Sequence, residues 1–125
     1  MIDFQNGTFA KLKPTSDADY SSWIKPMFVP GEEIIQTFRG IRDGVVFTNK
    51  RIFAINVQGI TGKKKDFTSL PYSKVQAYSV ETAGTFDLDC ELDLFFSGGI
   101  GQVRFEFKGS CDVIGLSKLI AGYLL

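Results

Sequence analysis

The most constraining feature of this sequence is a run of eight residues in which acidic and apolar side chains alternate strictly. Asp87-Leu88-Asp89-Cys90-Glu91-Leu92-Asp93-Leu94 has a period of two, which is the period of a β-strand and not of a helix. The run predicts a strand with its acidic face turned outward and its apolar face turned toward a core. The expected inward residues are Leu88, Cys90, Leu92 and Leu94. A chain with such a strand must place an apolar layer against one face of a sheet.

Six other stretches predict strands, because apolar residues alternate there and Gly, Asn or Pro interrupts the pattern between them. They are residues 33–39, 45–48, 51–57, 63–70, 74–82 and 102–108. Residues 112–125 have helical spacing instead, with Ser110 or Asp112 placed to cap the first turn. Near the other end of the chain, residues 17–23 predict a short helix that Pro26 ends.

These elements predict a mainly β fold. We expect a barrel of seven antiparallel strands in two near-orthogonal sheets, capped at one end by the C-terminal α-helix. Residues 1–30 have a different pattern and are expected to form a partly helical extension that packs on a domain made of residues 31–125. The length of 125 residues corresponds to a single domain with a sizeable core.

The composition excludes several kinds of catalytic and metal-binding site. The chain has no histidine, which excludes Ser-His-Asp and Cys-His catalysis and every metal site with a histidine ligand. Cys90 and Cys111 lack the spacing of a zinc or thioredoxin-like motif. With 14 basic and 14 acidic residues, no net field draws the protein to nucleic acid. We therefore expect no enzyme activity, no catalytic residue, no metal site, no cofactor and no nucleic-acid partner.

The sequence shows no pattern typical of a signal peptide or a membrane span. The first residues have no basic region followed by an apolar run, as a signal peptide would. No stretch approaches the roughly 18 apolar residues of a membrane span. We expect a cytoplasmic protein.

Four segments resemble the bacterial pleckstrin-homology (PH) domain family in their order and spacing. They are Arg42-Asp43-Gly44-Val45-Val46-Phe47-Thr48-Asn49-Lys50-Arg51 and residues 58–64, 70–72 and 80–89. The resemblance implies a PH-like barrel, no known enzymatic activity and self-assembly into closed, ring-like homo-oligomers. Together with the acidic strand it marks a set of candidate interaction residues. These are Arg42, Asp43, Thr48, Asn49, Lys50, Arg51, Glu81, Asp87, Asp89, Glu91 and Asp93.

The C-terminal helix is apolar on almost all sides, whereas capping one barrel end needs only one apolar stripe. The excess predicts a second contact, made either by residues 1–30 or by another subunit. Four residues are candidates for an interface between copies of the chain: Ile114, Leu119, Tyr123 and Leu124.

Charge is divided unevenly along the chain. Residues 1–65 carry 10 − 6 = +4 and residues 66–125 carry 4 − 8 = −4. If the two halves occupy different faces, a positive face of one copy can meet a negative face of the next, and such head-to-tail contacts form rings or filaments. If the halves mix in the folded protein, the division has no such consequence.

We therefore expect a non-enzymatic PH-like domain that forms a cyclic homo-oligomer and acts as a protein–protein interaction scaffold. Its partners are then other copies of the chain and an unidentified protein. The alternative function is binding of an anionic lipid or phosphate through Lys63, Lys64 and Lys65 with Arg42, and contact with a membrane belongs to this alternative.

Two charged segments keep further interpretations open. The three lysines also suit a solvated hairpin that protects a strand edge from aggregation. The acidic strand suits a salt-bridged outer face, a contact for a basic partner or, with help from a loop, a cation site.

Overall fold

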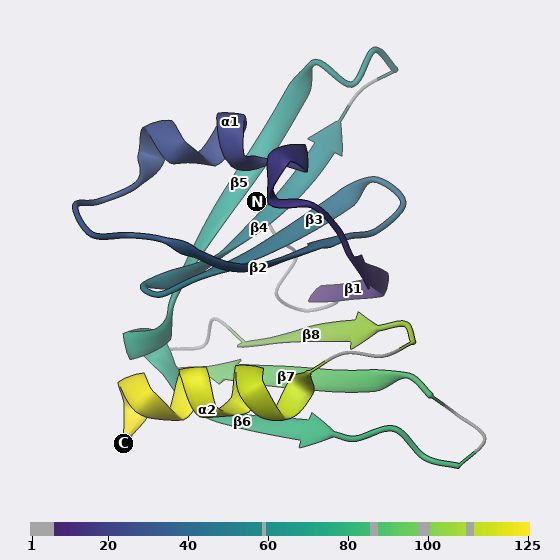
Figure 1. Ribbon diagram of the computed structural model, residues 1–125, viewed down its shortest axis with the longest axis vertical. Helices are drawn as coiled ribbons and strands as arrows, with labels where there is room; N and C mark the ends of the chain where they lie inside the picture. Colours follow the sequence, from purple (N-terminus) through teal and green to yellow (C-terminus); the bar gives the residue numbers. More distant parts are fainter. Residues whose placement is uncertain (1–6, 59, 86–87, 98–100, 110–111) are drawn as a thin grey trace.

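The computed structural model describes residues 7–58, 60–85, 88–97, 101–109 and 112–125, and Figure 1 shows how they are arranged. Within these residues eight strands form one sheet, in the order β5-β4-β3-β2-β1-β8-β7-β6. The strands are β1 (Gly7–Pro14), β2 (Ile34–Arg39), β3 (Asp43–Thr48), β4 (Arg51–Gln58), β5 (Lys64–Pro71), β6 (Val75–Glu81), β7 (Cys90–Phe96) and β8 (Gly101–Phe107). All pairs are antiparallel except β1 with β8, which is parallel.

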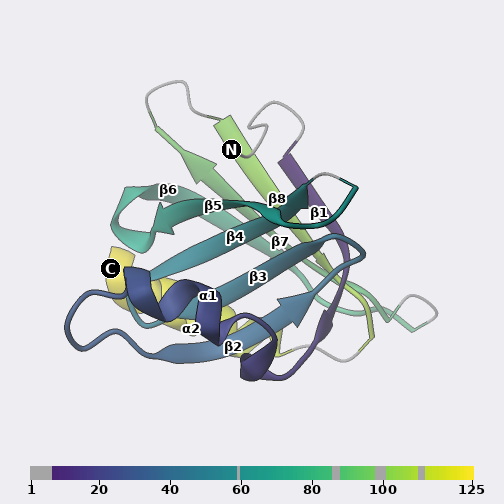
Figure 2. The same cartoon turned by 90° about the horizontal axis from the view of Figure 1, so that it is seen from above.

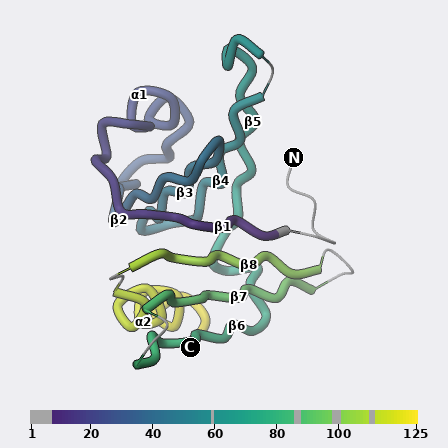
Figure 3. The backbone as a smooth tube through the Cα atoms, turned by 90° about the vertical axis from the view of Figure 1, so that its right-hand side faces the viewer, coloured from purple at the N-terminus to yellow at the C-terminus, as the bar shows by residue number. Residues whose placement is uncertain are grey.

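The sheet is curled into an open half-barrel. Its two halves, β2–β5 and β6–β8, cross each other when the molecule is seen from above (Figure 2), and β1 joins them by lying between β2 and β8 (Figure 3). β5 and β6 form the two edges of the sheet. The mainly β, PH-like architecture with a C-terminal helix is therefore confirmed.

The described residues contain eight strands and not the expected seven, and the additional strand is β1. It lies within the stretch that was expected to form the extension, while the proposed boundary at residue 31 stays a prediction. Its pattern is interrupted because the register with β8 shifts between Phe9 and Leu12. Both side chains are buried although they are three residues apart, so β1 lacks the period of two that identifies a strand.

The main core fills the space between the two halves of the sheet. Aromatic rings lie at its centre, where the Phe38 and Phe107 ring centroids are 4.6 Å apart. Helix α2 (Val113–Leu124) begins at Asp112, whose carboxylate accepts the Gly115 N–H at 2.9 Å, as the sequence predicts for an N-cap. The helix places three residues in the core: Val113, Leu116 and Ile120.

A second, smaller core lies on the outer face of β3 and β4. It is covered by a helical segment between β1 and β2 that consists of η1 (Asp17–Asp19), α1 (Ser21–Ile24) and η2 (Lys25–Met27). Tyr20 and Ile24 from this segment pack against Val46, Phe53 and Ile55. The short helix expected over residues 17–23 is thus one turn of α-helix between two 3-10 turns.

The acidic strand begins later than its pattern predicts. Regular pairing starts at Cys90, and Leu88, expected to face inward, is exposed in the connection before it. Asp87 lies outside the described residues. From Cys90 onward the prediction is correct for the apolar face, since Leu92 and Leu94 are buried.

Candidate functional site

The described part of the chain contains no group of three or more cysteine or acidic side chains placed to hold a metal ion. The helices of that part are all too short or too polar to cross a membrane.

Three of the motif residues fasten the β3–β4 hairpin to the segment before β2. The side chain of Glu32 is fully buried, and its carboxylate accepts bonds from Arg51 Nε at 3.0 Å and from the Thr48 hydroxyl at 2.7 Å. Asn49 uses both ends of its amide, accepting the Glu33 N–H at 2.8 Å and donating to the Gly31 carbonyl at 2.9 Å. The motif therefore has a structural role at this point, and the side chain of Lys50 is the exposed exception.

Burial and hydrogen bonding act in opposite directions on Glu32. Burial raises the pKa of its carboxyl, but the bonds from Arg51, Thr48 and the Val29 N–H, with the charge of Arg51, together outweigh burial and hold the pKa below its ordinary value. Sequence reasoning identified Arg51 and Thr48 but missed Glu32, because nothing in a linear pattern marks Glu32, and not the adjacent Glu33, as the partner of a residue 19 positions away.

The structure brings Arg42 and only one of the three loop lysines to Trp23. The Lys65 ammonium lies 4.6 Å from the centre of the Trp23 ring. Arg42 and Trp23 line the same hollow of about 320 Å³. Lys63 and Lys64 are exposed on the β4–β5 hairpin, which extends from one end of the molecule (Figure 1). The lysines thus do not gather into one cavity with Arg42.

Asp43 is the first residue of β3 and follows directly on Arg42 in the β2–β3 turn. Its carbonyl accepts a bond from the Tyr20 hydroxyl at 3.3 Å, and burial raises the pKa of its carboxyl. It anchors the helical segment and is half-buried, which favours a structural role for it as well.

The acidic residues of β6, β7 and β8 divide into two kinds. Asp93 is only 8% exposed, because Arg104 Nε donates to it at 2.8 Å and Gln102 at 3.2 Å. Asp89 accepts the Gly109 N–H at 3.3 Å. The expectation of a salt-bridged face thus holds for Asp93, although that residue is buried where the strand pattern placed it in solvent.

The remaining acids form a row across the outer face of three strands. Glu81 pairs in register with Glu91, and Glu91 with Glu106. Side chains directly opposite on neighbouring strands lie close together. Burial raises the pKa of Glu91, Arg104 at 3.8 Å opposes this, and the two neighbouring glutamates raise it further, so the net pKa is above its ordinary value. We call Glu81, Glu91 and Glu106 the acidic row.

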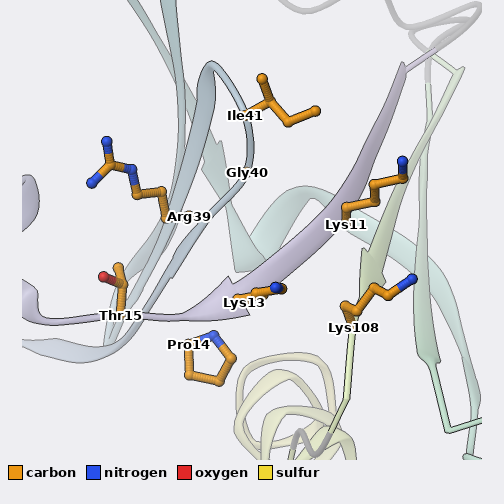
Figure 4. Close-up of a pocket in the computed structure, with 8 residues that line it drawn as sticks. All are labelled: Lys11, Lys13, Pro14, Thr15, Arg39, Gly40, Ile41 and Lys108. Carbon is orange, nitrogen blue, oxygen red and sulfur yellow. The ribbon is translucent and has the colours of Figure 1, made fainter.

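A basic groove lies where β1, the β2–β3 turn and the end of β8 meet (Figure 4). Its volume is about 440 Å³. The residues that line it are Lys11, Lys13, Pro14, Thr15, Arg39, Gly40, Ile41 and Lys108. Sequence reasoning missed this groove, because its cations come from three separate segments and make no local cluster.

The bulge in β1 creates the groove's geometry. Lys11 has a φ of +56°, in the left-handed region that lysine rarely adopts. In a regular strand Phe9, Lys11 and Lys13 would share one face. The bulge instead turns Phe9 and Leu12 into the core and leaves Lys11 and Lys13 exposed. The Lys108 N–H donates to the Leu12 carbonyl at 2.8 Å, which fixes the third lysine beside them.

Helix α2 presents part of the expected interface to solvent. Ile114 is 51% exposed and Tyr123 is 43% exposed, with its ring stacked 5.0 Å from that of Tyr72. Leu119 and Leu124 are partly buried against the main core. Two of the four predicted residues are therefore open to contact, and two mainly support the fold.

Comparisons with known proteins cover nearly the whole chain. The family model described as the bacterial PH domain matches residues 3–124. The uncharacterized protein YjqA of Bacillus subtilis is 37% identical over 121 residues, which is 96% of this chain and 97% of that protein. Uncharacterized protein YozO of the same organism is 33% identical over 81% of this chain and 86% of its own length.

Solved structures give the same picture. A DUF1696 family protein with a pleckstrin-homology domain from Shewanella loihica is 38% identical, with a TM-score of 0.77, over 94% of this chain and 100% of that one. A pleckstrin homology domain from Shewanella amazonensis is 40% identical, with a TM-score of 0.64, over 89% of this chain and 90% of the other.

Proposed function

This chain belongs to the bacterial PH domain family, and from that premise we propose that it is a non-enzymatic interaction module that joins copies of itself head to tail into a closed ring. The observation that carries the proposal is the separation of charge within one molecule. Residues 1–65, with a net charge of +4, build β1–β4, the helical segment and the start of β5, whereas residues 66–125, with −4, build the remainder of β5, β6–β8 and α2 (Figure 1).

Two exposed surfaces carry these opposite charges. Lys63 and Lys64 extend from the β4–β5 hairpin, and the acidic row lies on the outer face of β6, β7 and β8. These surfaces have opposite charge and occupy different halves of the molecule, so a contact between them is heterologous and leaves one copy with an unused acidic surface and the other with an unused basic surface. Repetition of such a contact gives a closed ring when the rotations between successive copies add up to a full turn.

The state of Glu91 supports a cationic partner. Burial is the main cause of its raised pKa, Arg104 opposes the rise, and Glu81 and Glu106 add to it, so the glutamates of the row repel one another when ionised. Lysines from a second copy would relieve that repulsion. The exposed side chains of Ile114 and Tyr123 supply apolar area that can be buried at the same time.

The proposal is tested by measuring the mass of the purified protein by light scattering and sedimentation at tens of micromolar in low and high salt. We expect one discrete mass, an integer multiple of 13.9 kDa, in low salt. Salt should dissociate the assembly, because contacts between exposed charges are screened. A monomer in low salt would contradict self-association, and an assembly that salt strengthens would contradict the charge mechanism.

A scaffold role toward a second, unidentified protein and a cytoplasmic location remain predictions that accompany this proposal. The alternative of anion binding through Lys63, Lys64, Lys65 and Arg42 has less support. The Lys65 ammonium lies over the Trp23 ring, and none of the three lysines lines the hollow that Arg42 lines. The geometry favours a different place for an anion.

A further inference from the structure

We propose that the basic groove formed by Lys11, Lys13, Arg39 and Lys108 binds a phosphate-bearing ligand, a function separate from the proposed self-assembly. The groove shares no residue with the acidic row, with the tip of the β4–β5 hairpin or with α2. Its ligand chemistry therefore does not depend on whether copies of the chain associate.

The first argument is uncompensated charge. Four of the eight lining residues are cationic and none is acidic. In the part of the chain that the structure describes, Lys11, Lys13 and Lys108 have no carboxylate within ion-pair distance. Like charges held close together repel, and a multivalent anion placed among them would remove that repulsion. Phosphate provides two charges and several acceptor oxygens in a volume that suits such a site.

The second argument is that a fourth cation, Arg39, lies at the groove and is paired from outside it. Arg39 Nη1 lies 3.6 Å from Asp19 Oδ2, and the same oxygen accepts the Thr15 hydroxyl at 2.6 Å. Asp19 does not line the groove, so it orients the guanidinium from outside while the Arg39 side chain stays 63% exposed. In Figure 4 the Arg39 guanidinium is turned away from Lys11 and Lys108, so it would have to swing toward the groove to bring its fork of N–H groups, the geometry that matches phosphate oxygens, to a ligand.

The third argument is backbone strain at Lys11. A left-handed conformation is unfavourable for a non-glycine residue, and asparagine or glycine would adopt the φ of +56° at lower cost. The bulge alone explains why Phe9 and Leu12 reach the core, but it does not explain a lysine at the strained position. A cation required in the groove explains that choice.

The fourth argument is size and shape. A volume of about 440 Å³ suits a small ligand. The β2–β3 turn lies against β1 at Gly40, where a Cβ atom would be in ordinary van der Waals contact with the Ala10 carbonyl at 3.4 Å and the Leu12 side chain at 3.6 Å. Ile41 is 85% exposed beside the cations, where it can contact the organic part of a phosphate ester or the acyl region beneath a lipid headgroup.

The test uses the full chain with pyrophosphate, with glycerol phosphate, and with phosphatidylcholine vesicles that contain or lack phosphatidic acid. Calorimetry and thermal unfolding measure the soluble ligands, and co-sedimentation measures the vesicles. The variants are Lys13→Gln/Lys108→Gln and Lys11→Asn, which removes a charge while tolerating the left-handed backbone. Lys63→Gln/Lys64→Gln removes the same number of charges as the double variant, outside the groove.

We expect pyrophosphate to bind and to raise the unfolding temperature of the wild-type protein. The double variant should bind at least about tenfold more weakly, because two cationic hydrogen-bond donors to the phosphate are lost. Lys63→Gln/Lys64→Gln should bind as the wild type does. Preference for phosphatidic acid vesicles over soluble phosphates would identify a lipid headgroup as the source, and the reverse a free phosphate ester.

Absence of binding to every probe would overturn the proposal, as would equal weakening by the groove and hairpin variants. Sedimentation of Lys13→Gln/Lys108→Gln in the absence of ligand keeps the two proposals separate, since its assembly mass should equal that of the wild type. A monomeric wild-type protein that still binds pyrophosphate through the groove would leave this inference standing and remove only the ring.

Discussion

Arg51 donates to both carboxylate oxygens of Glu32, from Nε at 3.0 Å and from Nη2 at 2.9 Å. The same guanidinium donates to the Met27 carbonyl at 2.6 Å and lies 4.2 Å from the centre of the Phe53 ring. One side chain therefore connects the β3–β4 hairpin, the end of the helical segment and the chain that enters β2. Two family-motif residues, Arg51 and Thr48, make this connection.

Replacing Arg51 by methionine should destabilise the protein by about 3–5 kcal/mol, because it leaves the Glu32 carboxylate buried without its cation. Denaturant unfolding measures the change. Lys50→Met is the matched control, since Lys50 is adjacent and exposed, and it should stay within about 0.5 kcal/mol of the wild type. Equal effects of the two substitutions would show that the buried pair contributes nothing.

Glu32 should also control stability in acid. Its folded-state pKa is lowered, so its contribution is fully present above the ordinary glutamate pKa of about 4.3 and is lost as pH falls through the lower folded value. Glu32→Gln should therefore be less stable than the wild type at neutral pH, and the difference should shrink on acidification. Unfolding free energies at a series of pH values test this, and a difference that is constant with pH would contradict it.

Gly44 is required by the contact between β3 and the helical segment. A Cβ atom at this position would overlap the Tyr20 ring, so Gly44→Ala should destabilise the protein by about 1–3 kcal/mol through overpacking. Trp23, the only tryptophan of the chain, lies with its ring 5.4 Å from that of Tyr20 and reports the displacement by fluorescence.

The control for this substitution is Gly122→Ala in α2. No atom lies within 4 Å of the added Cβ there, and alanine favours a helix over glycine by up to about 1 kcal/mol. Gly122→Ala should be as stable as the wild type or more so, with unchanged fluorescence. A Gly44→Ala protein that behaved in the same way would contradict the packing argument.

Glu91 should have opposite effects on the subunit and on the assembly. Its raised pKa means that ionisation of Glu91 opposes folding as pH rises through that pKa. Glu91→Gln should then stabilise the separate subunit at neutral pH by about 0.2–1 kcal/mol, measured in dilute solution, and should weaken assembly in sedimentation. A variant that assembles as tightly as the wild type would exclude the acidic row from the contact.

Sequence patterns predicted the fold well wherever one face of an element alone is buried. The apolar sides of β7 and β8 and the buried stripe of α2 follow from their periods. β1 was missed because its bulge separates Phe9 from Leu12 by three residues. The second core was missed because β4 is buried on both faces. A strand of this kind reads as a continuous apolar run, and such a run does not show which element covers each face.

The candidate site was less predictable for a related reason. Arg51 and Glu32 are 19 residues apart, and the cations of the basic groove come from β1, from the end of β2 and from the residue after β8. Their proximity is a product of strand order, which places β1 between β2 and β8. Local spacing contains no trace of that order, and the basic cluster that the sequence does show, Lys63 to Lys65, lies on the β4–β5 hairpin and outside the basic groove.

The most direct test of head-to-tail assembly uses two variants that each lack one surface. Lys63→Gln/Lys64→Gln removes the basic surface and Glu81→Gln/Glu106→Gln removes most of the acidic row. Each protein alone should sediment as a monomer of about 13.9 kDa, and an equimolar mixture should form a 1:1 dimer and nothing larger, because one intact surface of each kind remains. Either variant forming the complete wild-type assembly by itself, or a mixture that stays monomeric, would contradict the account.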